Sequence, residues 1–270
     1  MEYLNLWLVA YLALGAFVGF LAGLLGIGGG MILVPFLVLV FQAQGFPFET
    51  KMQVILATSM ATIIFTSFSS VRAHQAKGAV NWNVVLNMSP GILLGALVGT
   101  RIVSMLSTQF LAVFFTCFLF YTGTQMLLNF KPKASRVLPG RAGLFAAGVV
   151  VGVLSALVGA GGGFFSIPFL TWNNVPIHNA VGTSAALGFP IAVFTTIGNI
   201  WNGWNMPNVP QPSLGYVYLP ALFGIAFASV FTAPFGARLA HRLPVATLKR
   251  ILAVMLYLLA LRMLYSVLTV

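Results

Sequence analysis

Two clusters of glycine interrupt strongly apolar stretches of the chain, and a proline follows each cluster. The residues are Gly28, Gly29, Gly30 and Pro35 in one stretch, and Gly161, Gly162, Gly163 and Pro168 in the other. Each glycine inside a helix costs about 1 kcal/mol relative to alanine. We interpret the clusters as helix breaks that direct free N–H groups toward an anion. The alternative interpretation is that the glycines only permit close helix packing.

The two clusters belong to an internal repeat. Residues 24–37 read LLGIGGGMILVPFL and residues 157–170 read LVGAGGGFFSIPFL, with eight of fourteen positions identical. Weaker matches follow in the same order along the chain, which predicts two homologous halves, 1–130 and 142–270, joined by a basic cytoplasmic linker over 131–141. Helix breaks at corresponding positions of two halves are typical of a ligand site between repeats.

Hydroxyl side chains recur after both glycine clusters. Thr58 and Ser59 lie early in the next apolar segment of the first half, and Thr183 and Ser184 match them in the second. Such hydroxyls donate to an oxyanion without bringing charge into lipid, although they also bond to carbonyls of their own helix. We include all four residues in the candidate substrate-binding site.

A second matched position pairs Gln125 with Arg262, and Arg262 stands inside an apolar segment. A guanidinium is costly there unless it has a role or reaches the interface. Facing the interior, it would bind a sulfonate or carboxylate through two hydrogen bonds; facing outward, it would extend to the membrane surface. Both interpretations stay open, and both residues join the candidate substrate-binding set.

Composition and segment lengths define the fold class. The chain has 270 residues, 60% hydrophobic and 6% charged, with a mean hydropathy of +1.01. No soluble core accommodates so much apolar surface, so we predict an all-α polytopic membrane protein. We expect about seven or eight transmembrane helices with glycine-broken helices, and short fold-back segments at 31–41 and 164–171. The remaining apolar segments cover 6–25, 54–71, 84–103, 110–130, 142–158, 180–200, 216–235 and 248–270.

The distribution of basic residues predicts the orientation of the halves. The net charge is +11, and cations cluster in the linker 131–141, between 238 and 250, and beside 72–77. All three stretches are expected on the cytoplasmic side, while the nearly uncharged loop 201–213 is expected outside. This is possible only if each glycine-broken unit turns back, which gives the two halves inverted topology.

The paired motifs, Gly-x-Gly-Gly-Gly-x-x-x-x-Pro at 26–35 and 159–168, resemble those of the TauE/SafE sulfite exporter family, also called the 4-toluene sulfonate uptake permeases. The resemblance covers essentially the whole chain. It implies a secondary transporter that moves sulfite, sulfoacetate or other sulfonates across a bacterial cytoplasmic (inner) membrane by alternating access. A passive anion channel and a carrier for carboxylates are the alternatives.

The sequence does not favour an enzyme. His74, His178 and His241 are scattered at segment ends, and neither an HExxH nor a GxSG motif occurs. No cofactor or metal site is implied. The expected partners are a small anionic substrate and the lipid bilayer, with a homodimer possible and no nucleic acid.

Overall fold

The computed structural model describes residues 2–25, 29–128, 137–240 and 245–268, which form ten α-helices. The first half contains α1 (Glu2–Leu25), α2 (Gly30–Ala43), the 3-10 turn η1 (Phe48–Thr50), α3 (Lys51–Gln75), α4 (Trp82–Met105) and α5 (Thr108–Leu127). The second half contains α6 (Arg141–Val158), α7 (Gly163–Trp172), α8 (Ile177–Gly203), the antiparallel strands β1 (Ser213–Leu214) and β2 (Val217–Tyr218), α9 (Leu219–Ala240) and α10 (Val245–Leu268). The prediction of an all-helical polytopic protein is confirmed.

Six of the described helices have the length and apolar composition of a membrane span. They are α3, α4, α5, α6, α8 and most of α9. The helices α1 and α10 have 24 residues each, about 36 Å, which also matches the hydrocarbon layer. In contrast, α2 has 14 residues and α7 has 10, which at 1.5 Å per residue give about 21 Å and 15 Å.

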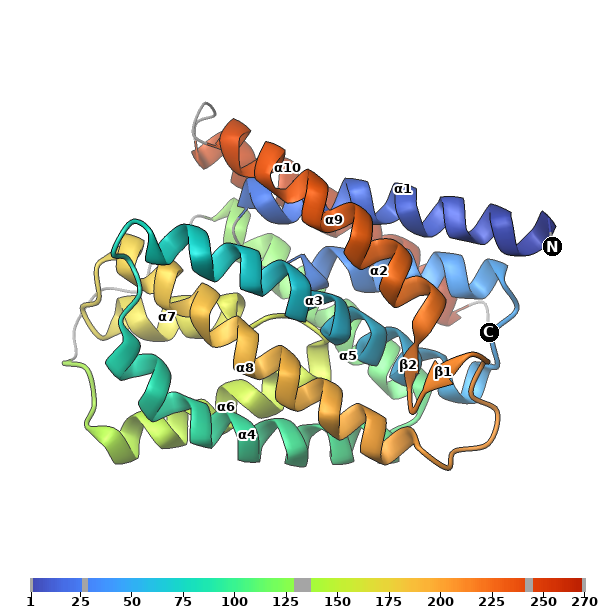
Figure 1. Ribbon diagram of the computed structural model, residues 1–270, viewed down its shortest axis with the longest axis horizontal. Helices are drawn as coiled ribbons and strands as arrows, with labels where there is room; N and C mark the ends of the chain where they lie inside the picture. The colour runs from blue at the N-terminus through green and yellow to red at the C-terminus, as the bar shows by residue number, and fades with distance from the viewer. Residues whose placement is uncertain (1, 26–28, 129–136, 241–244, 269–270) are drawn as a thin grey trace.

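The short helices are fold-back segments, as predicted. In Figure 1, α1 runs from right to left and α2 returns toward the right, whereas α6 and α7 reverse in the opposite sense. Glycines in the left-handed conformation make both reversals possible: Gly29 has φ 71° at the start of α2, and Gly159 has φ 63° at the end of α6. The two halves therefore have inverted topology.

Helices of one half pack against helices of the other half. The first helix of each half lies against the fourth helix of the other, so α1 packs on α9 and α6 packs on α4. The third helices, α3 and α8, pack together, and so do the fifth helices, α5 and α10. This reciprocal arrangement is the expected result of a pseudo-two-fold axis between inverted repeats.

Glycines make the cross-repeat helix pairs unusually close. A Cβ atom added to Gly95 of α4 would lie 2.1 Å from the carbonyl oxygen of Val149 in α6, and one added to Gly15 of α1 would lie 2.5 Å from that of Ile225 in α9. The spacing Gly91, Gly95, Gly99 places three glycines on one face of α4. Backbone contact of this kind stabilises helix pairs in lipid, where no hydrophobic effect drives association.

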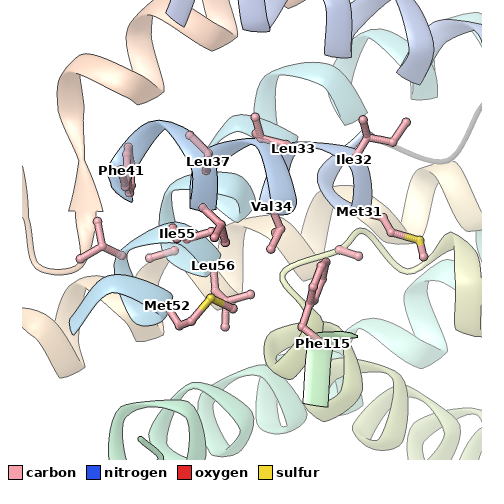
Figure 2. Packing of buried hydrophobic residues seen from close by; sticks show 14 of the residues in the cluster. Met31, Ile32, Leu33, Val34, Leu37, Phe41, Met52, Ile55, Leu56 and Phe115 are labelled. Atoms are coloured by element: carbon pink, nitrogen blue, oxygen red, sulfur yellow. The ribbon is translucent and has the colours of Figure 1, made fainter. Parts of the chain in front are cut away.

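The helix α2 forms the centre of the larger hydrophobic core. In Figure 2, Met31 and Val34 lie on the side of α2 that faces α3 and Phe115 of α5, whereas Ile32 and Leu33 project from its opposite side. The fully buried residues of α2 include Ile32, Val34 and Leu37. In α7 only Ser166 and Leu170 are buried. The two fold-back helices thus differ: α2 is enclosed by protein, whereas most side chains of α7 are partly exposed.

Basic residues are concentrated at one end of the molecule. The ends of α3, α5 and α9 lie toward the left of Figure 1, and the hairpin β1–β2 lies at the right. The sequence carries Arg72 and Lys77 at the α3–α4 connection, and further cations between α5 and α6 and around the α9–α10 connection. By the positive-inside rule, a concentration of cations of this kind is expected on the cytoplasmic side. Trp201 and Trp204 are exposed near the opposite end, as expected of interfacial aromatic residues.

Candidate binding site between the repeats

The glycine segments of the two halves meet at one serine. The Ser59 hydroxyl in α3 lies 3.0 Å from the carbonyl oxygen of Gly159 and 3.4 Å from that of Gly30, and it donates to these oxygens. A Cβ atom at Gly30 would lie 2.7 Å from the same Gly159 oxygen. Ser59 is fully buried. The hydroxyl therefore links the start of α2 to the break between α6 and α7.

The corresponding serine of the second half also bonds beside a glycine. The hydroxyls of Ser184 in α8 and Ser166 in α7 are 3.1 Å apart, and the Ser166 hydroxyl donates to the carbonyl oxygen of Gly162. A Cβ atom at Gly162 would lie 2.3 Å from Cδ1 of Ile191. Gly161 is buried and Gly163 begins α7, half-buried, whereas Gly28 lies outside the described residues.

Thr58 and Thr183 form a reciprocal pair of hydrogen bonds across the repeats. The backbone N–H of Tyr218, just before α9, donates to the Thr58 hydroxyl at 3.0 Å. The backbone N–H of Asn81, just before α4, donates to the Thr183 hydroxyl at 2.9 Å. Both threonines are fully buried. Sequence reasoning considered a ligand or the residue's own helix as partner, but each oxygen accepts from the opposite half.

The two threonine bonds lie at opposite ends of the molecule. Tyr218 belongs to β2 at the right of Figure 1, and Asn81 belongs to the α3–α4 connection at the left. The Tyr218 ring packs edge-on against Phe41 and Phe46. Burial raises the pKa of the Tyr218 phenol, so this side chain stays neutral at physiological pH. Each end therefore contains a hydrogen bond from one repeat to the other.

The prolines do not break the helices, which corrects the helix-break assignment. Pro35 lies inside α2 and Pro168 lies inside α7, each at the sixth position of its helix. The breaks fall at the glycines before Gly30 and Gly163. A proline in a helix interior removes one backbone hydrogen bond, and membrane helices tolerate this where neighbouring groups compensate.

The matched pair Gln125 and Arg262 lies on the fifth helices of the two halves, α5 and α10. Arg262 is exposed on α10, where its guanidinium carbon lies 5.6 Å from the centre of the Tyr265 ring. Gln125 is half-buried on α5. The exposed position of Arg262 favours the outward-facing alternative over an inward contact with an anion.

Three buried hydroxyls that sequence reasoning missed have no hydrogen-bond partner. They belong to Ser155 in α6 and to Thr195 and Thr196 in α8. Several other hydroxyls in the described helices, including those of Thr62 and Thr66, donate to a carbonyl of their own helix. No local signal in the sequence distinguishes the two groups. Within the described residues no group of three His, Cys, Asp or Glu side chains is placed to hold a metal ion.

The chain matches known proteins over nearly its full length. The family model described as sulfite exporter TauE/SafE matches residues 11–263. A probable membrane transporter protein of Haemophilus influenzae is 37% identical over 254 residues, covering 93% of this chain and 96% of the relative. A probable membrane transporter protein of Methanocaldococcus jannaschii is 26% identical and covers 85% of each chain. No solved structure matches the chain.

Proposed function

The chain belongs to the TauE/SafE sulfite exporter family and is a multi-pass membrane transporter, and from that premise we propose that it carries small organosulfur anions across a bacterial cytoplasmic membrane. Sulfite, sulfoacetate and related sulfonates form the proposed substrate class. The observation that carries this proposal is the contact between the glycine segments of both repeats at Ser59. Repeat interfaces of this kind hold the substrate in secondary transporters.

The chemistry around this contact suits an anion that sheds water. The buried polar groups of α3 and α8 include neutral serine and threonine hydroxyls. The helices α2 and α7 begin at Gly30 and Gly163, so their first N–H groups have no acceptor inside the helix and carry partial positive charge. Neutral donors bind an oxyanion strongly enough for recognition and permit its release on the other side.

We propose that alternating access uses the two threonine bonds. Opening toward the outside requires the Thr58 hydroxyl to release the N–H of Tyr218, while the bond between Thr183 and Asn81 keeps the cytoplasmic end closed. Opening inward reverses the roles. Because the repeats are inverted, each end has one threonine hydrogen bond of the same kind. The same bond-breaking step can therefore open the protein toward either side.

Binding and counterflow experiments test the proposal. The purified protein is heated in detergent with sulfite, sulfoacetate, taurine, sulfate and simple carboxylates. A ligand at about 100 times its Kd stabilises the folded state by about 2.7 kcal/mol, so a selective increase in Tm with a sulfonate or sulfite is expected. A selective increase with carboxylates would instead assign the carboxylate carrier. In proteoliposomes, saturation and counterflow are expected of a carrier, and linear flux without counterflow would assign a channel.

A further inference from the structure

The second repeat contains buried hydroxyls that lack partners, and the first repeat does not match them. The Ser155 and Thr195 side chains are fully buried, and their hydroxyls bond to no other protein group. An unpaired buried hydroxyl is unfavourable for folding. The hydroxyls of Thr66 and Ser67 in α3 avoid this cost, because each donates a hydrogen bond to a carbonyl of its own helix. Within the described residues, Ser155 and Thr195 share this unpaired state with Thr196 alone.

Both hydroxyls lie just beyond the start of α7. At the level of Gly162, where α7 begins, Val151 of α6 and Ile191 of α8 lie against the backbone, 3.6 Å and 2.3 Å from a Cβ atom placed there. Ser155 follows Val151 by four residues and Thr195 follows Ile191 by four residues. Residues four apart share a helix face, and α6 and α8 run in the same direction in Figure 1. The two hydroxyls therefore lie one turn beyond Gly162, on the faces of α6 and α8 that contact the start of α7.

A contact further along α8 agrees with this placement of α7 beside α8. Ser184, which lies on the same face of α8 as Ile191, has its hydroxyl 3.1 Å from that of Ser166 in α7. The helix α7 thus runs antiparallel to α8, from Ile191 back toward Ser184, and its N-terminus points toward Thr195. Thr196 follows directly and is also buried without a partner.

The corresponding position of the first repeat has no hydroxyl. Ala22 stands where the second repeat has Ser155, and a Cβ atom at Gly29 would lie 2.9 Å from the Ala22 side chain. Beside the start of α2 lies the carbonyl oxygen of Gly159, 2.7 Å from a Cβ atom placed at Gly30. A carbonyl oxygen carries partial negative charge, which is unfavourable for a neighbouring anion.

We propose that Ser155 and Thr195 donate hydrogen bonds to the oxyanion group of the transported substrate at the start of α7. The binding site then lies in the second repeat, and the glycine segment of the first repeat is a structural support. This inference rests on the proposed function. The first N–H groups of α7 complete the set of donors.

The test measures affinity and ligand-free stability in the same variants. Sulfite and sulfoacetate are titrated into the detergent-purified full chain, wild type and with Ser155→Ala, Thr195→Val or Thr195→Ser. Hydrogen bonds to a charged group correspond to a loss of about ten- to hundredfold in affinity. We expect that loss in Ser155→Ala and Thr195→Val, near-normal affinity in Thr195→Ser, and no fall in ligand-free Tm, because each removed hydroxyl was unpaired. Thr66→Val is the matched control and should bind normally.

Each contrary result has a distinct meaning. Wild-type affinity in both Ser155→Ala and Thr195→Val would overturn this inference and leave the proposed function standing. A loss of affinity together with a lower ligand-free Tm would assign the hydroxyls a structural role and also overturn it. If the wild-type protein binds neither sulfite nor sulfoacetate, the proposed substrate class is wrong and the inference falls with it.

Discussion

Replacing Gly30 by alanine should separate the two glycine segments. The added Cβ atom would lie 2.7 Å from the carbonyl oxygen of Gly159, whereas a carbon–oxygen contact needs roughly 3.3 Å. The Gly159 oxygen belongs to a backbone turn and cannot rotate away. A shift of about 0.6 Å would lengthen the 3.0 Å hydrogen bond from Ser59 beyond the normal range.

The expected cost combines overpacking with the weakened hydrogen bond. Inserting a methyl group into a packed interior costs about 1–3 kcal/mol, and one net hydrogen bond contributes about 0.5–1.5 kcal/mol. The sum of about 1.5–4.5 kcal/mol corresponds to a fall in Tm of about 3–18 °C for a chain of this size. Thermal unfolding in detergent measures this change, and proteoliposome uptake should fall with it.

The matched control is the same substitution at Gly188 in α8. A Cβ atom there meets only the Ser67 Cβ at 3.8 Å, an ordinary contact. Alanine in a helix is favoured over glycine by about 1 kcal/mol, so Gly188→Ala should keep or raise the Tm. Equal Tm values for Gly30→Ala and Gly188→Ala would refute the close approach of the two glycine segments.

Three further perturbations have defined outcomes. Thr58→Val and Thr183→Val each leave a buried backbone N–H unpaired, at a cost of about 1–3 kcal/mol. A cysteine reporter should become more accessible to a thiol reagent at the outer end in Thr58→Val and at the cytoplasmic end in Thr183→Val. The control Thr66→Val should change the accessibility at neither end. Arg262→Gln should leave sulfonate affinity unchanged because the guanidinium is exposed, and a tenfold loss in a binding titration would return it to the site. Gly95→Leu should prevent α4 from packing on α6, which size-exclusion chromatography would detect as loss of folded protein; a normal elution profile and Tm would contradict the contact.

The helices could be predicted from the sequence because lipid imposes a length on each apolar segment. The segment predicted at 54–71 is α3 over Lys51–Gln75, and that predicted at 84–103 is α4 over Trp82–Met105. The differences lie at the ends, where polar caps extend a helix past its apolar part. Asn81 illustrates this, because its side chain accepts from the N–H of Val84 at the start of α4.

The site was only partly predictable. The repeated glycines indicated the two helix breaks, because a break depends on local backbone freedom. The loop charges indicated that the short segments fold back, because the charges depend on how the chain is oriented in the membrane. The partners of Thr58 and Ser59 depend on how the halves dock, which no local pattern specifies. Ser155 was missed for a related reason: a helical serine ordinarily bonds within its own helix, and only the packed structure shows that this one does not.

The exchange of partners between halves has a consequence for biosynthesis. In α1, Gly15 lies against Ile225 of α9, a residue that the ribosome adds about 210 residues later, or about 10–40 s at ordinary translation rates. During that time the glycine face of α1 lies in the bilayer without α9 packed against it. In contrast, α4 meets α6 soon after synthesis, since Gly91 lies against Phe145. A truncated chain that ends before α9 should therefore contain a completed α4–α6 pair and an unpaired first helix, available to insertion factors or quality-control proteases.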